Sequence, residues 1–164
     1  GLAGKDAKHV LERAARLHEI GLLLSHDQYH KHGAYVLEHA DLPGYSRDDQ
    51  LLLAVLVRRH RRSVPADAFA ALPKATVGAA RRLCTLLRLA VVLHRGRSSE
   101  PLPPIALQVD RQRLHLLFPC GWLAAHPLTR ADLQIEAALL AKAGFALRFG
   151  DARQRDRQLP PSTS

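Results

Sequence analysis

The chain has 164 residues, of which 47 % are hydrophobic, so it can bury one core, or one core with a small appendage. Lysine and arginine total 24 against 15 acidic residues, and the resulting net charge of +9 favours partners that carry phosphate groups. No apolar run reaches the roughly 18 residues of a membrane span and no signal-peptide pattern opens the chain, which argues against membrane-spanning and secreted classes and predicts a cytoplasmic protein. The sequence contains no methionine, so we expect a fragment of a longer protein.

The first half of the chain shows helical patterns. Over residues 5–24 apolar side chains recur in alternating steps of four and three, which predicts one amphipathic helix. A shorter helix is expected over 32–39, because a Pro-Gly turn follows it soon after. Ser46 and Asp49 have the spacing of a capping box, which predicts a third helix that ends in the basic run 58–62.

A long helix is predicted over 75–94, with Cys84 on its apolar face. Cys84 and Cys120 are far apart and have no metal-ligand spacing, so we expect Cys84 to be a buried free thiol in a reducing compartment. A second basic cluster, 94–97, stands at the end of this helix. Cations at that position also stabilise the helix dipole, so the cluster by itself does not indicate a binding site.

The composition changes after this helix. Residues 97–104 are rich in proline and serine and predict a linker. Beyond it, 105–109 and 114–118 predict a β-hairpin, 129–143 predicts a helix, and 145–149 predicts a third strand. The expected fold class is therefore mostly α, a helical bundle followed by a small β-β-α-β subdomain.

The predicted organisation has four parts: a helical domain over 1–96, the linker 97–104, the α/β subdomain 105–150 and a disordered tail 151–164. A β-β-α-β unit of this size cannot bury much surface alone. Trp122, just before the predicted helix, is interpreted as a core or docking residue.

Several blocks of sequence, taken in order, resemble the C-terminal half of bacterial exopolyphosphatases. The blocks are Leu17-His18-Glu19-Ile20-Gly21-Leu22, His26, His30-Lys31-His32-Gly33-Ala34-Tyr35-Val36-Leu37, Asp41-Leu42-Pro43-Gly44-Tyr45 and Leu56-Val57-Arg58-Arg59-His60-Arg61. These enzymes form the exopolyphosphatase and guanosine pentaphosphate phosphohydrolase family. The resemblance covers residues 5–96 well and the β-β-α-β part more loosely.

The resemblance implies how the parent protein is built. In that family a pair of actin-like domains holds the catalytic site, an HD-like helical domain follows, and a small α/β domain closes the chain. The Gly-rich phosphate loops and catalytic carboxylates of the actin-like half do not occur in this sequence. The chain would thus be an N-terminally truncated HD-like domain with the α/β subdomain, and we expect no catalytic residue in it.

An HD-type hydrolase binds a divalent metal through an adjacent His-Asp pair, an earlier His and a later Asp. The resemblance aligns His18 and Glu19 with the pair and Val91 with the later Asp, and no earlier His is identified. Because valine has no ligand atom, we expect no metal and no cofactor in this chain, whereas the parent enzyme would use Mg²⁺.

Two interpretations remain open for four polar residues of the first half of the chain. They either form a polar core that is satisfied by hydrogen bonds, or they are the vestige of a metal site. The residues are His18, Glu19, His26 and His30.

A second set of residues predicts a surface for inorganic polyphosphate. Arginines suit a phosphate chain because their guanidinium groups bind phosphate in two-pronged fashion, without sequence or metal requirements. The set comprises Lys31, His32, Arg58, Arg59, His60, Arg61 and Arg62. Taken singly, each arginine is also compatible with an ordinary solvated surface.

The preferred function is the accessory part of an exopolyphosphatase. It would hold the polyphosphate chain and support homodimerisation while the actin-like domains release orthophosphate from its end. One alternative is a metal-dependent HD-like phosphohydrolase acting on guanosine penta- or tetraphosphate. A further alternative is an RNA-binding module, although aromatic residues make up only 5 % of the chain and offer little for base stacking.

Overall fold

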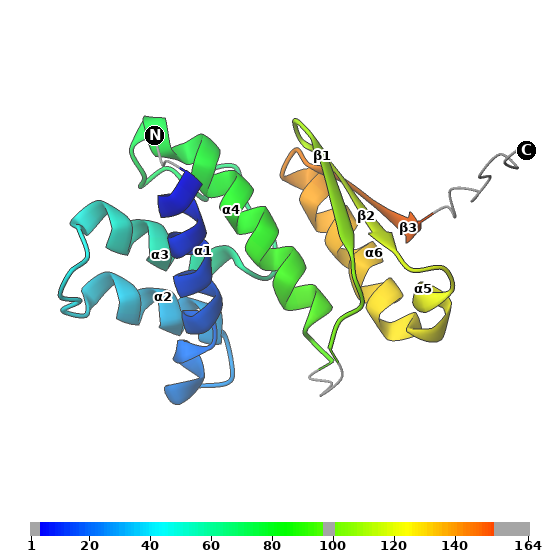
Figure 1. Cartoon of the computed structure of the whole chain (residues 1–164). Helices are drawn as coiled ribbons and strands as arrows, with labels where there is room; N and C mark the ends of the chain where they lie inside the picture. Colours follow the sequence, from blue (N-terminus) through cyan, green and yellow to red (C-terminus); the bar gives the residue numbers. More distant parts are fainter. Residues whose placement is uncertain (1–3, 97–100, 153–164) are drawn as a thin grey trace, which may run out of the picture.

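The computed structural model describes residues 4–96 and 101–152, which form a helical part and a smaller α/β part (Figure 1). The helical part consists of α1 (Gly4–Leu17), the 3-10 helix η1 (Ile20–Leu23), α2 (Tyr29–His39), α3 (Arg47–Arg59) and α4 (Lys74–Leu93). The α/β part consists of β1 (Ala106–Asp110), β2 (Arg113–Phe118), α5 (Trp122–Ala125), α6 (Pro127–Lys142) and β3 (Ala146–Asp151). The predicted fold class, mostly α with a small β subdomain, is confirmed.

The single helix predicted over 5–24 is wrong, because α1 ends at Leu17. The reason lies at Gly21, where a Cβ atom would stand 1.9 Å from the Tyr29 carbonyl oxygen and 2.5 Å from the Gly33 amide nitrogen. The chain breaks so that η1 can pack backbone to backbone against α2. Leu24, expected on the buried stripe, is 62 % exposed as a result.

The capping box predicted for the third helix is confirmed. The Ser46 hydroxyl oxygen accepts a hydrogen bond from the Asp49 amide at 3.2 Å and donates to the Asp49 carboxylate at 2.7 Å. One turn further, the buried side chain of Gln50 donates to the carbonyl oxygens of Leu37 and Ala40. These bonds satisfy carbonyl groups at the end of α2 and fix that end against the start of α3.

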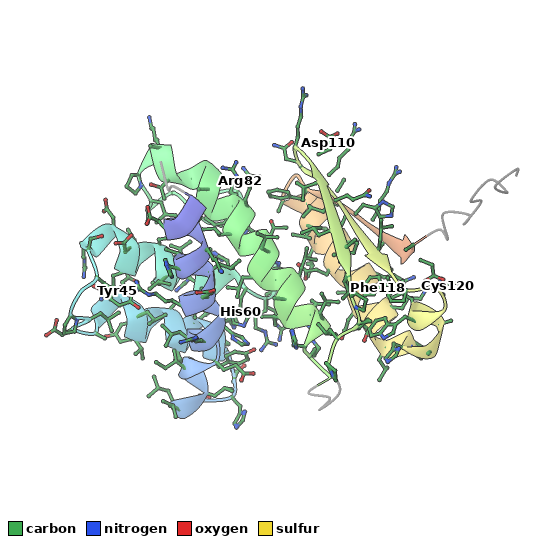
Figure 2. The ribbon with its side chains drawn as sticks, in the orientation of Figure 1. Tyr45, His60, Arg82, Asp110, Phe118 and Cys120 are labelled. Atoms are coloured by element: carbon green, nitrogen blue, oxygen red, sulfur yellow. The ribbon has the colours of Figure 1, made fainter. Side chains whose placement is uncertain are left out.

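The three strands form one sheet in the order β1-β2-β3, with β1 antiparallel and β3 parallel to β2. Both the predicted hairpin and the third strand are therefore present. The short helix α5 was not predicted. It opens with Trp122, whose ring stacks on Phe118 with 5.1 Å between ring centroids. Phe118 is the last residue of β2 and is labelled in Figure 2. Trp122 thus packs against the core, as interpreted from the sequence.

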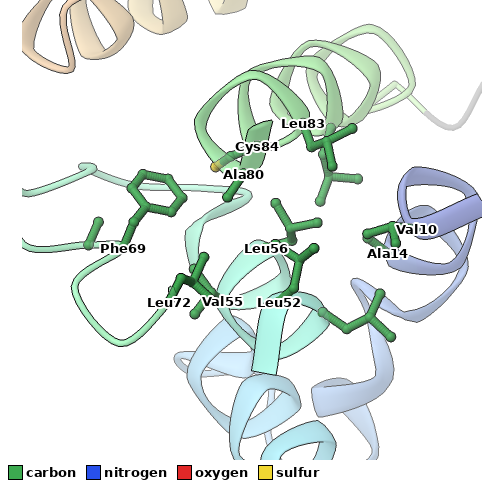
Figure 3. Packing of buried hydrophobic residues seen from close by; sticks show 13 residues of the cluster. Val10, Ala14, Leu52, Val55, Leu56, Phe69, Leu72, Ala80, Leu83 and Cys84 are labelled. Carbon is green, nitrogen blue, oxygen red and sulfur yellow. The ribbon is translucent and has the colours of Figure 1, made fainter. Parts of the chain in front are cut away.

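Helix α4 contributes to two hydrophobic clusters. Its first part packs through Ala80, Leu83, Cys84 and Leu87 against residues of α1 and α3. Figure 3 shows Leu83 of α4 together with Ala14 of α1 and Leu56 of α3 in this cluster. Its C-terminal part contributes to a second cluster with the sheet and α6. The members of this second cluster are Leu89, Val92, Leu114, Leu116, Phe118, Leu123, Leu133, Leu140, Phe145 and Leu147. The α/β part therefore completes its core with residues of the helical part.

Part of the predicted organisation lies outside the described residues. This holds for residues 97–100 of the expected linker and for 153–164 of the expected tail. Within the described residues, none of the helices combines the length and the apolar character that a membrane span requires.

The close approach at Gly21 gives a stability prediction. We expect Gly21→Ala to lower the free energy of unfolding by on the order of 2 kcal/mol or more, because the added methyl group meets backbone atoms that cannot move independently. Urea unfolding followed by circular dichroism would measure the loss. Gly96→Ala is the matched control, since a Cβ there meets no atom within 4 Å, and equal stability of the two variants would contradict the packing described.

Candidate functional site

A groove of about 1070 Å³ runs between the helical part and α6. Six polar residues line it, three of them arginines, and we call this set its cationic side: His18, Glu19, Arg61, Arg62, His94 and Arg95. The apolar residues that line it, which we call its apolar side, include Leu87, Ala90, Val91, Ile135 and Leu139. Because α4 and the segment after α3 line it together with α6, the groove exists only when the two parts of the chain are packed together.

A cluster of aromatic and imidazole rings lies beneath the cationic side of the groove. His60 forms its centre and is labelled in Figure 2. Its ring lies 5.2 Å from that of His18, 5.5 Å from Tyr29 and 6.3 Å from His30, measured between centroids. His60 Nδ1 donates to the Val57 carbonyl oxygen at 2.6 Å, and its Nε2 accepts from the Tyr29 hydroxyl at 3.3 Å. We call His18, Tyr29, His30 and His60 the ring cluster.

Burial keeps two members of this cluster neutral. It lowers the pKa of His60 to about 3, against the opposing effect of the Val57 carbonyl and with help from the neighbouring His18 and His30. Burial also lowers the pKa of His30 to about 4, and the next causes are the positive charges of Arg61 and Lys31. The positive charge next to the groove therefore comes from arginine side chains and not from these imidazoles.

The basic run 58–62 does not present all of its side chains to the surface. His60 is only 2 % exposed, so it supports the surface from below and does not form part of it, contrary to what the sequence interpretation assumed. Arg59 is half-buried, and its Nε atom is buried without a hydrogen-bond partner. Arg61 lies over the Tyr29 ring, 4.8 Å from its centroid, and Arg62 adopts a left-handed backbone with φ of 63°. Arg61 and Arg62 are the two members of the run that line the groove.

The remaining predicted residues are distributed around this surface. Lys31 and Arg58 are exposed, and both are close enough to His30 to lower its pKa, although neither lines the groove. His32 is partly exposed on α2. His26 is exposed and makes no ring contact within the described part of the chain, so the structure does not bring it into the ring cluster.

The residues at the HD-like position do not fit a divalent metal. His18 Nε2 and Glu19 Oε1 are 4.0 Å apart, and Val91 lines the same groove but offers no ligand atom. His60 uses both ring nitrogens in hydrogen bonds to Val57 and Tyr29. Across residues 4–96 and 101–152, no group of three or more His, Cys, Asp and Glu side chains is arranged to hold a metal ion.

Sequence reasoning missed three contributions to this site. Tyr29 gave no signal, because it stands outside the predicted helix and has no periodic partner. His94 and Arg95 were noticed only as a helix end. Ile135 and Leu139 form a second apolar pair with helical spacing on α6, beside the predicted core stripe, and that spacing is a signal that could have indicated an additional apolar surface.

Comparison with known proteins assigns this arrangement to a family. The family model described as "Ppx/GppA phosphatase, domain III" matches residues 2–137. The chain belongs to the Ppx/GppA phosphatase family. This confirms the resemblance on which the sequence interpretation rested, and it identifies the chain as the domain III portion of such a phosphatase.

Individual relatives agree with this assignment. A guanosine-5'-triphosphate,3'-diphosphate pyrophosphatase of Pseudoalteromonas translucida is 38 % identical over 138 residues, which is 84 % of this chain and 28 % of the relative. A protein of the same name from Vibrio cholerae is 38 % identical over 142 residues, which is 87 % of this chain and 28 % of the relative. This Ppx/GppA domain III chain thus spans less than a third of the length of these relatives.

The neutral histidines predict a loss of stability in acid. Because the folded-state pKa values of His30 and His60 lie below the ordinary 6.5, the unfolded chain binds more protons below pH 6.5, and stability falls as the pH drops toward about 4 and 3. Urea unfolding at pH 7, 6, 5 and 4 should show this decline, and it should be shallower in His30→Gln. The exposed His26→Gln is the control, and identical slopes in all three proteins would contradict the assignment.

Proposed function

We propose that this domain III chain is the substrate-holding portion of an exopolyphosphatase. Its groove would hold the chain of inorganic polyphosphate while actin-like domains of the same protein, with Mg²⁺, hydrolyse the terminal phosphoanhydride and release orthophosphate. The observation that carries the proposal is the cationic side of the groove, formed by Arg61, Arg62 and Arg95 from two different segments. Cytoplasmic location and homodimerisation are proposed on the sequence interpretation alone.

The chemistry of the arginines supports this proposal. Arg61 and Arg62 make no ion pair within the described part of the chain, so their charge is available to a ligand. Arg95 is partly neutralised by Asp132 at 2.7 Å. A guanidinium group binds phosphate through two parallel hydrogen bonds and is weakly hydrated, which favours it over lysine for this task. Exposed Lys31 and Arg58 extend the positive field beyond the groove.

A long polyanion gains from several weak contacts at once. Each arginine that leaves one phosphate can rebind the next, so a row of cations keeps the substrate at high local concentration without fixing its register. This is the requirement for repeated removal of terminal phosphates from one chain. The proposed role therefore needs only the groove and no catalytic residue in this part of the protein.

A second candidate ligand is guanosine penta- or tetraphosphate. It is favoured by the apolar side of the groove, which a polyphosphate chain does not use but against which a nucleoside could pack. The names of the relatives from Pseudoalteromonas and Vibrio point in the same direction. Hydrolysis of such a nucleotide by this chain itself would need a metal that the residues around Val91 do not fit.

A titration of the purified chain with long-chain polyphosphate at two salt concentrations tests the proposal. We expect salt-sensitive binding, and the double variant Arg61→Gln/Arg62→Gln should bind several-fold more weakly with a salt slope smaller by roughly 1 per arginine. The charge-matched control is Arg82→Gln/Arg111→Gln, which removes two exposed arginines that do not line the groove. An equal loss of polyphosphate affinity in both double variants would contradict the proposal, because the loss would then follow from net charge alone.

Competition distinguishes the candidate ligands. Displacement of bound polyphosphate by guanosine tetraphosphate at similar concentration would favour the nucleotide, and displacement by single-stranded RNA would favour the nucleic-acid alternative. Resistance to both supports polyphosphate.

A variant at Arg62 should affect binding and stability in opposite directions. Its φ of 63° is unfavourable for a residue with a Cβ, so Arg62→Gly should raise the free energy of unfolding by about 1 kcal/mol. The same variant should bind polyphosphate more weakly, because it loses one guanidinium group from the groove. Thermal unfolding and the titration above measure the two effects. A more stable variant with unchanged affinity for polyphosphate would show that Arg62 does not belong to the binding site.

A further inference from the structure

Arg88 is a fully buried arginine outside the groove. It lies on α4 and is only 1 % exposed. Its Nε atom donates to Glu136 Oε1 at 2.6 Å, and its Nη2 atom donates to Glu136 Oε2 at 3.0 Å. Glu136 lies on α6 and is 4 % exposed. A two-pronged ion pair between two buried side chains therefore joins the helical part to the α/β part.

The same guanidinium group reaches a third helix. Its Nη1 atom donates to the Arg59 carbonyl oxygen at 2.7 Å. Arg59 is the last residue of α3, where backbone carbonyl groups have no partner within the helix. The thiol of Cys84 also approaches this oxygen, at 3.5 Å, and burial raises the pKa of that thiol to about 12, so it stays protonated and can donate. The buried side chain of Arg88 on α4 thus connects the C-terminal end of α3 with a side chain of α6.

Two of these helices, α4 and α6, line the groove, and the third, α3, leads into the segment that supplies its arginines. Arg61 and Arg62 stand two and three residues after Arg59, and Ile135 and Leu139 lie within one turn of Glu136 on α6. We propose that Arg88 and Glu136 are positioning residues, which hold the cationic side of the groove at a fixed place relative to its apolar side. This inference rests on the proposed function, because it concerns the same groove.

The other polar links between these elements cannot replace this one. Arg95 and Asp132 also join α4 to α6 at 2.7 Å, but Arg95 is half-exposed and such pairs add little stability. Arg81 donates to the Ala143 carbonyl oxygen at the end of α6 and does not touch α3. Cys84 approaches the Arg59 carbonyl oxygen but makes no contact with α6, so among these links Arg88 alone joins Arg59 to α6.

A buried ion pair is a weak argument for stability, since apolar residues of similar volume often serve equally well. What distinguishes the pair from an apolar contact is its fixed geometry. The planar guanidinium group of an arginine fits a carboxylate in one orientation, whereas apolar side chains can shift relative to one another. Stability and positioning can therefore be separated by experiment. Arg88→Met/Glu136→Leu would fill the space without the directional bonds, and Arg88→Lys would keep a charge for Glu136 but lack the fork that also reaches Arg59.

Two measurements test the inference. The first is hydrogen exchange of the backbone amides of residues 60–63 without ligand, and the second is the polyphosphate titration, each accompanied by thermal unfolding. In both variants we expect the backbone amides of residues 60–63 to exchange several-fold faster and polyphosphate to bind several-fold more weakly. For the double variant we expect these changes even if its melting temperature equals that of the parent chain. Arg82→Gln, an exposed change on the same helix, is the control and should alter neither exchange nor melting.

The possible outcomes are distinct. Parental exchange and parental affinity in a stable double variant would overturn the inference, because the pair would then serve packing alone. Should the double variant fail to fold, Arg88→Lys decides by the same criteria. Should the parent chain itself not bind polyphosphate, the proposed function fails, and unchanged exchange at 60–63 in either variant would still refute the positioning role.

Discussion

The packing of α4 against both halves of the molecule is the constraint on which the rest of the structure depends. One stretch of this helix completes the core of the helical part, and the next stretch completes the core of the sheet and α6. Neither cluster would be closed without it. Arg88 crosses the same junction with a buried charge, so the two parts meet in a defined orientation as well as along an apolar surface.

This junction creates the groove, and the groove has two chemical sides. Arginines that follow α3 and α4 line it together with apolar side chains of α4 and α6. Behind the arginines, buried imidazoles stay neutral because burial and the nearby cations both disfavour their protonated form. The molecule therefore concentrates positive charge at its surface while the layer below remains uncharged.

Three residues that the sequence interpretation aligned with an HD-like metal site lie close together in the fold. These residues, His18, Glu19 and Val91, all line one groove. The missing carboxylate at Val91 and the hydrogen bonds that occupy both nitrogens of His60 leave no set of ligands among the described residues. Such a site can hold an anion through arginines more readily than it can activate water through a metal.

The sequence by itself determined the fold class, the family and most of the elements, because helical periodicity, the Ser46 capping box, the strand patterns and the ordered blocks around His18 are local signals. It also indicated that the basic run 58–62 matters. It did not give the end of α1 at Leu17 or the short helix α5. Only the tertiary structure decided which members of the run line the groove, since the groove includes residues of α4 and α6 that are distant in the sequence. The end of α1 likewise depends on a distant contact, because Gly21 packs against the backbone of Tyr29 and Gly33 in α2. Burial of His60 and the pairing of Arg88 with Glu136 were likewise undetermined, because a side chain's exposure and partner depend on how helices pack and not on their spacing in the chain.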